Sequence, residues 1–178
     1  MRDPVVGIVV GSESDLPVVR DAGAMLERLG IGWELVLASA HRTPDLAAGY
    51  AANAAGRGIR VLIAAAGGAA HLAGACAART VLPVIGLPVG GGALAGLDAL
   101  YATVQMPPGV PVATVAINGA VNAALLAAQI IALGDDTCAA RLGEYRRELT
   151  AAVEEKSRAL THEGLEAYMA RRFGKDRT

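Results

Sequence analysis

Residues 5–15 have the sequence VVGIVVGSESD, an unbroken apolar run that ends in a turn of small and polar residues. The same arrangement recurs along the chain, with apolar runs at residues 33–38, 60–65, 83–87 and 112–117. None of these runs alternates between apolar and polar residues, so we expect strands that are covered on both faces. Helical patterns separate them, at residues 15–29, 44–57, 70–79, 92–104 and 119–133.

Five consecutive strand–helix units predict an α/β fold of three layers, with a doubly wound, five-stranded parallel sheet between helices. We expect the flavodoxin-like strand order 2-1-3-4-5. The length of 178 residues suits one domain. Residues 1–134 are predicted to form the flavodoxin-like domain with the candidate catalytic residues. Residues 135–178 alternate in charge and predict a C-terminal helical extension, either a solvated helix that closes the fold or a helix packed on a neighbouring subunit.

Composition limits the possible partners and the compartment. A net charge of −1 argues against a nucleic acid or an anionic membrane surface, which both require an excess of Lys and Arg. The apolar runs at residues 61–70 and 120–133 are too short, or too rich in Gly and Ala, for membrane spans of about 20 residues. Cys76 and Cys138 have no CxxC spacing and no secretory leader is present, so we expect a cytoplasmic protein.

The first polar turn, Gly11-Ser12-Glu13-Ser14-Asp15, leads into a helical pattern. Helix amino termini with serine hydroxyls favour a phosphate, and Asp15 could accept hydrogen bonds from sugar hydroxyls. The alternative is that Ser14 or Asp15 only caps the helix. The turn is neither a Walker loop nor a G-x-G-x-x-G motif, which disfavours ATP and nicotinamide dinucleotides.

Two further turns carry candidate chemistry. Ser39-Ala40-His41-Arg42 places an imidazole, which exchanges protons near neutral pH, beside a guanidinium that can bind phosphate. His41 could instead be a hydrogen-bonded structural residue. Gly67-Gly68-Ala69-Ala70 has almost no side chains, so its backbone could approach a flat ligand or a carboxylate, or could simply pack tightly.

No H-E-x-x-H pattern and no paired Cys/His spacing occur in the sequence, so we expect neither a metal nor a cofactor. A serine nucleophile is disfavoured because its G-x-S-x-G turn is also missing. General acid–base chemistry on a phosphorylated small molecule is the remaining expectation.

Several blocks in order closely resemble the family of phosphoribosylaminoimidazole carboxylase catalytic subunits, and within it the bacterial mutase branch. The resemblance covers about residues 5–133. It depends on the turns already described and on the blocks Gly67-Gly68-Ala-Ala-His71-Leu72, Leu97-Asp98-x-Leu100, Val104-Gln105-Met106-Pro107 and Asn122-Ala-Ala-Leu125-Leu126-Ala-Ala-Gln129.

The resemblance implies an isomerase of de novo purine (IMP) biosynthesis. Such an enzyme moves a carboxyl group from the exocyclic nitrogen of N5-carboxyaminoimidazole ribonucleotide to ring carbon 4, without metal or cofactor. It also implies a homo-octamer with sites between neighbouring subunits, and a functional link to the ATP-dependent synthetase of the N-carboxylated substrate.

By position, the resemblance makes His41 the general acid and base and His71 a second active-site histidine. Ser12, Asp15 and Arg42 would bind the ribonucleotide. We expect further substrate contacts from Ser14, Ser39, Gly67, Gly68 and Ala69.

Two alternatives remain. Direct carboxylation of aminoimidazole ribonucleotide by carbon dioxide would use the same site, although Arg42 favours the mutase because direct carboxylases resemble a Ser-Ala-His-Lys version. The other alternative is a non-enzymatic nucleotide- or flavin-binding module, and an aromatic content of 3% disfavours flavin.

Gly90-Gly91-Gly92 departs from the family pattern, which commonly has Gln-Ser there. The glycines lack the side-chain hydrogen bonds that Gln and Ser could form.

Overall fold

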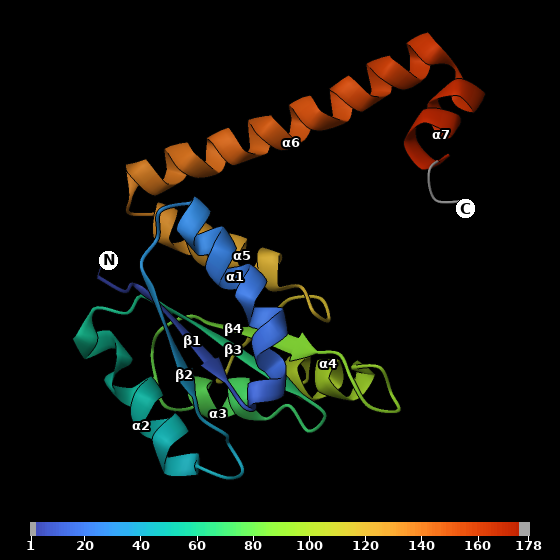
Figure 1. Ribbon diagram of the computed structural model, residues 1–178. Helices are drawn as coiled ribbons and strands as arrows, with labels where there is room; N and C mark the ends of the chain where they lie inside the picture. The colour runs from blue at the N-terminus through green and yellow to red at the C-terminus, as the bar shows by residue number, and fades with distance from the viewer. Residues whose placement is uncertain (1–2, 175–178) are drawn as a thin grey trace. The chain divides into compact units, whose positions relative to one another are not determined.

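The computed structural model describes residues 3–174 and contains the predicted parallel sheet (Figure 1). Its five strands lie in the order β2-β1-β3-β4-β5, which confirms the expected flavodoxin-like topology. The strands are β1 (Val6–Val10), β2 (Trp33–Leu37), β3 (Val61–Gly67), β4 (Val84–Val89) and β5 (Ala113–Thr114).

Helices cover both faces of this sheet. In Figure 1, α1 (Leu16–Arg28) and α5 (Ala120–Ala132) lie on one face, and α2 (Pro44–Ala54) and α3 (Leu72–Ala77) lie on the other. The fourth helix, α4 (Leu97–Val104), shares the face of α3, since a Cβ added to Gly86 in β4 would meet both Thr103 and Ala73. Short 3₁₀ turns at Glu13–Asp15 (η1) and Ala55–Arg57 (η2) precede α1 and follow α2.

The core lies around the three central strands. Every residue of β1 and β4 is buried, as the unbroken apolar runs predict. Strand β2 is different because it lies at the edge of the sheet, where Leu35 and Leu37 are 43% and 52% exposed. Full coverage of both faces therefore holds for the central strands and not for β2.

The last strand is much shorter than the sequence predicts. Only Ala113–Thr114 pairs as β5, in place of residues 112–117. The chain nevertheless continues beside β4, because Val115 N–H donates to the Gly86 carbonyl at 3.0 Å and Asn118 N–H donates to that of Pro88 at 2.9 Å. Asn118 has a φ of +58°, which turns the backbone away from strand geometry.

The predicted helix at 92–104 also begins later, at Leu97. Residues 90–96 form a turn in which Gly92, Ala95 and Gly96 have φ values of +63°, +50° and +93°. A right-handed helix cannot include such residues, so the glycine-rich sequence delays the helix start.

Two helices follow the sheet domain, α6 (Asp136–Glu163) and α7 (Leu165–Phe173). Contacts divide the chain into two units, Met1–Ala139 and Ala140–Thr178. Within the second unit, Arg171 forms two hydrogen bonds of 2.9 Å to the Glu163 carboxylate across the turn between the helices. Within residues 3–174, no helix combines the length and apolar character that crossing a membrane requires.

Candidate active site

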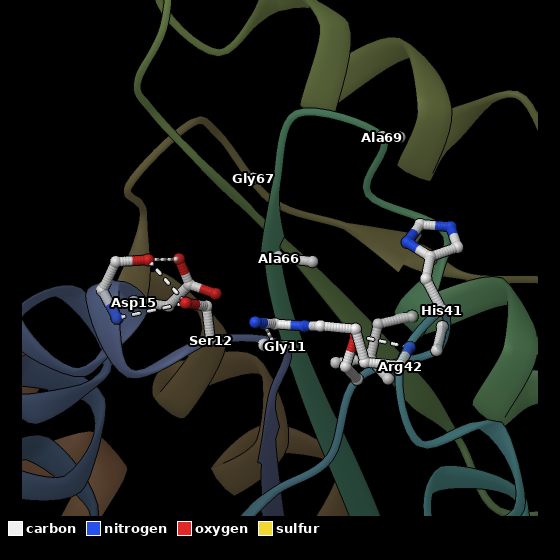
Figure 2. A pocket seen from close by; sticks show the side chains of 12 residues that line it. Gly11, Ser12, Asp15, His41, Arg42, Ala66, Gly67 and Ala69 are labelled. Carbon is white, nitrogen blue, oxygen red and sulfur yellow. Dashed lines mark hydrogen bonds between the residues drawn. The ribbon is translucent and has the colours of Figure 1, made fainter.

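The three turns identified in the sequence, two of them polar and one rich in glycine, meet at the carboxyl edge of neighbouring strands β2, β1 and β3. They surround a hollow of about 370 Å³, shown in Figure 2. Its lining residues are Gly11, Ser12, Ser14, Asp15, Ser39, Ala40, His41, Arg42, Ala66, Gly67, Ala69 and Leu72. The sheet order thus brings together segments up to 61 residues apart in the chain, from Gly11 to Leu72.

The turn after β1 is organised by Ser12, which caps η1. Its Oγ accepts hydrogen bonds from the Ser14 backbone N–H at 3.4 Å and from the Ser14 hydroxyl at 2.9 Å. Asp15 stands at the N-cap of α1 but forms no side-chain cap bond, so the alternative that Asp15 simply caps this helix is wrong.

The Asp15 carboxylate lines the hollow although the residue is only 5% exposed. Burial raises the pKa of Asp15, against the opposing effects of hydrogen bonds from Ser14 and Ser12 and of the Arg42 charge. A desolvated carboxylate of this kind is a strong acceptor for a ligand hydroxyl group.

The turn after β2 is closed by its own side chains. Ser39 Oγ accepts from the Arg42 backbone N–H at 3.2 Å, and Ser39 N–H donates to Thr43 Oγ1 at 2.8 Å. The Arg42 guanidinium crosses to the neighbouring strand, where Nη2 donates to the Gly11 carbonyl at 3.0 Å (Figure 2). The Gly11 carbonyl is a neutral partner, so it orients Arg42 while the guanidinium keeps its charge and can still bind an anion.

His41 contacts His71, the residue that immediately precedes α3. His41 Nε2 lies 2.9 Å from His71 Nδ1, and the rings meet edge to face with centroids 4.9 Å apart. One ring must donate and the other accept in this bond, which ties the tautomers of the two imidazoles together. His71 does not itself line the hollow.

The glycine segment after β3 both packs closely against a neighbouring strand and lies at the hollow, the two possibilities considered from the sequence. A Cβ on Gly67 would lie 3.2 Å from the Val89 carbonyl oxygen of β4, so the close approach of the two strands favours glycine there. Gly67 also lines the hollow, as does Ala69. Gly68 has a φ of +59° and lies outside the lining, unlike the other predicted substrate contacts.

Sequence reasoning did not single out Gly11, Ala40, Ala66 and Leu72 as lining residues. All four adjoin predicted site residues in the chain, and this adjacency was the available signal. A second hollow of about 380 Å³ shares several residues with the first, and it was also not predicted. Its lining consists of Gly11, Ser12, Glu13, Leu37, Ser39, Arg42 and Thr43.

Residues 3–174 contain no group of three or more His, Cys, Asp or Glu side chains arranged to hold a metal ion. The chemical groups around the first hollow are therefore an imidazole pair, one guanidinium, one buried carboxylate, hydroxyls and a thin backbone segment. These groups suit proton transfer on a phosphorylated sugar derivative.

Comparison with known proteins assigns this chain to a family, since the family model described as AIR carboxylase matches residues 5–152. The chain belongs to the AIR carboxylase family. Within this family, N5-carboxyaminoimidazole ribonucleotide mutase of Pyrococcus horikoshii is 51% identical over 167 residues, which cover 94% of each chain.

Two further matches are a relative with a different name and a solved structure. Phosphoribosylaminoimidazole carboxylase of Schizosaccharomyces pombe is 49% identical over 96% of this chain but 31% of its own length. The crystal structure of Treponema denticola PurE superimposes with a TM-score of 0.81 at 28% identity, covering 88% of this chain and 98% of that one. This match confirms the fold class.

Proposed function

We propose that this protein is an N5-carboxyaminoimidazole ribonucleotide mutase, an isomerase of purine biosynthesis. The observation that carries the proposal is the His41–His71 pair at a hollow that also contains Arg42 and Asp15. Near-full-length relatives with this name, about half identical to the chain, support the same activity.

We assign ribonucleotide binding to the polar turns. Arg42, Ser12 and Ser39 hold the phosphate, because a guanidinium and hydroxyls provide charge-assisted donors at one rim of the hollow. Asp15 accepts from the ribose hydroxyls, with Ser14 beside it. This anchoring positions the aminoimidazole ring near His41 without contributing to the chemical step directly.

His41 acts as the proton shuttle in this proposal. It protonates the exocyclic nitrogen, the carbon–nitrogen bond of the carbamate breaks, and carbon dioxide leaves. Ring carbon 4 then attacks carbon dioxide, and His41 recovers its proton when that carbon loses its hydrogen. Proton donation and removal balance, so one imidazole serves both steps.

His71 and the glycine segment complete the site. The 2.9 Å bond to His71 orients the His41 ring and fixes which of its nitrogens carries a proton. The backbone at Gly67 and Ala69 holds the migrating carboxylate and shields carbon dioxide from water. Every step is a proton transfer or a carboxyl transfer, so the proposed reaction uses no metal and no cofactor.

The test is an assay of the purified protein with the N-carboxylated ribonucleotide, with a chelator present. We expect formation of the 4-carboxylated ribonucleotide at a rate that does not change on adding bicarbonate. Absence of this product would refute the mutase assignment.

Direct carboxylation is the second candidate. The similarity of the chain to carboxylases such as the S. pombe enzyme supports it. This reaction would consume aminoimidazole ribonucleotide and carbon dioxide at the same site. Faster turnover of the uncarboxylated ribonucleotide with bicarbonate than of the N-carboxylated one would reverse our choice between the two reactions.

We also propose that the protein works as a homo-oligomer, an octamer by family resemblance. Helix α4 and the turn before it support self-association, because they expose a group of apolar side chains. The group consists of Leu94 in the turn and of Leu97, Tyr101 and Val104 at helical spacing on α4, all 46–60% exposed. Light scattering of the purified protein tests this proposal, and a monomer at micromolar concentration would contradict it.

The remaining proposals concern the cellular setting. Cys76 and Cys138 are both buried, and neither forms a disulfide within the described residues, as is typical of a reducing compartment such as the cytoplasm. We propose a functional link to the ATP-dependent synthetase of the N-carboxylated substrate, because that substrate is labile. The match to less than a third of the S. pombe carboxylase shows that this relative carries additional sequence, which agrees with linked activities.

A further inference from the structure

The second hollow of the site contains an acidic residue that the proposed reaction does not use. This hollow shares Gly11, Ser12, Ser39 and Arg42 with the first, and Glu13 contributes the carboxylate among its lining residues. Glu13 is exposed at the start of η1. Among the ion pairs found within residues 3–174, none involves Glu13.

The shared residues are the ones that hold the phosphate in the proposed function, on which this inference rests. Arg42 is the cation among the residues that line the second hollow, and Glu13 lines the same hollow with a carboxylate of opposite charge. A phosphate monoester carries a charge of about −1.5 to −2 at neutral pH. A ligand phosphate bound by Arg42, Ser12 and Ser39 is therefore attracted by the Arg42 guanidinium and repelled by the Glu13 carboxylate.

We propose that Glu13 is a specificity-determining residue that limits the affinity of this site for phosphate esters. The repulsion acts equally on substrate and product, because both have the same phosphate and only the carboxyl group moves. Glu13 therefore weakens binding of both ribonucleotides without altering the barrier between them. Its effect is faster product release at the expense of a higher KM.

The experiment compares two ligands by titration calorimetry: the stable 4-carboxylated ribonucleotide and the corresponding riboside without phosphate. Replacing Glu13→Gln removes the charge and keeps nearly the same shape. We expect about threefold to tenfold tighter binding of the ribonucleotide at low salt, and a smaller gain at about 0.5 M salt, because exposed charges are screened. Riboside affinity stays unchanged.

Glu27→Gln is the matched control, because it makes the same charge change on α1 and lines neither of these two hollows. It should leave both affinities unchanged. Glu13→Asp keeps the charge and should bind the ribonucleotide as the wild type does. Circular dichroism confirms the fold of each variant.

Unchanged or weaker ribonucleotide binding by Glu13→Gln overturns the inference. An equal gain for ribonucleotide and riboside also overturns it, because the effect would not depend on the phosphate. These outcomes are independent of turnover. Absence of product formation by the wild type counts against the mutase assignment, whereas an unchanged affinity in Glu13→Gln counts against the role of Glu13 alone.

Discussion

The turns after β1 and β2 differ in construction from the segments after β4 and β5. In the first pair, polar side chains bond to nearby backbone, as Ser12 does with Ser14 and Ser39 with Arg42. In the second pair, Ala95 and Asn118 have positive φ values and glycines are frequent. The comparison indicates that the hydrogen-bonded polar turns position the chemical groups, whereas the glycine-rich segments allow the backbone to turn with positive φ values. Four substitutions, described from the largest expected effect to the smallest, test this division.

His41→Asn tests the chemical side of the comparison most directly. Removing a general acid or base typically lowers turnover by about 10²–10⁴-fold, and we expect a loss in this range. Binding of the 4-carboxylated product should persist, because the phosphate contacts remain. Steady-state kinetics and calorimetry measure the two effects separately.

His162→Asn is the matched control for this variant, because His162 lies in α6, outside the unit that contains the site. It should leave turnover unchanged. Near-normal turnover of His41→Asn would remove His41 from the mechanism.

Arg42→Ala should weaken ribonucleotide binding by about 10-fold to 100-fold, since a hydrogen bond to a charged group contributes about 1.5–3 kcal/mol. The variant also loses the contact with the Gly11 carbonyl that orients the guanidinium. Calorimetry with the 4-carboxylated product measures the loss. Arg20→Ala, which removes an exposed arginine from α1, should bind normally. Equal affinities for wild type and Arg42→Ala would disprove the phosphate assignment.

Asn118→Ala tests the other half of the comparison, the segments after β4 and β5. Its Oδ1 accepts a hydrogen bond from the Gly90 N–H at 2.7 Å, and its φ of +58° suits Asn better than Ala. We expect a loss of about 1–2 kcal/mol in the free energy of unfolding, with turnover within about threefold of wild type. Urea denaturation and kinetics measure these quantities.

Asn118→Gly separates the two causes, because it removes the hydrogen bond while permitting positive φ. Asn53→Ala, on the exposed surface of α2, serves as the control. A large loss of turnover in a folded Asn118→Ala protein would show that the segment after β4 belongs to the chemical site, and the comparison would fail.

Ala95→Gly should give the smallest effect. Ala95 has a φ of +50°, where glycine has no steric penalty, so we expect a gain of about 0.5–1 kcal/mol in stability. Ala93→Gly, in the same exposed turn, has no positive φ to relieve and should be neutral or destabilising. Thermal unfolding of both variants measures the difference. Destabilisation by Ala95→Gly would show that its side-chain contacts outweigh the backbone strain.

Sequence patterns predicted the first part of the fold better than the last. Strands β1 and β3 follow from continuous apolar runs, which leave few other structures possible for a buried segment. Strand β5 was predicted too long, and α4 was predicted to begin too early. In both cases a single residue, Asn118 or Ala95, changes the backbone direction. Local hydrophobicity contains no signal for that change.

The sequence alone determined which chemical groups this protein possesses, namely an imidazole and a guanidinium after one strand and a seryl turn after another. Their residue types and positions after apolar runs were sufficient, because parallel strands end at a common edge. Only the tertiary structure decided that His41 bonds to His71, that Arg42 crosses to Gly11, and that the Asp15 carboxylate is desolvated. These contacts join segments about 30 residues apart, so they depend on the order and register of the strands, which local sequence does not encode.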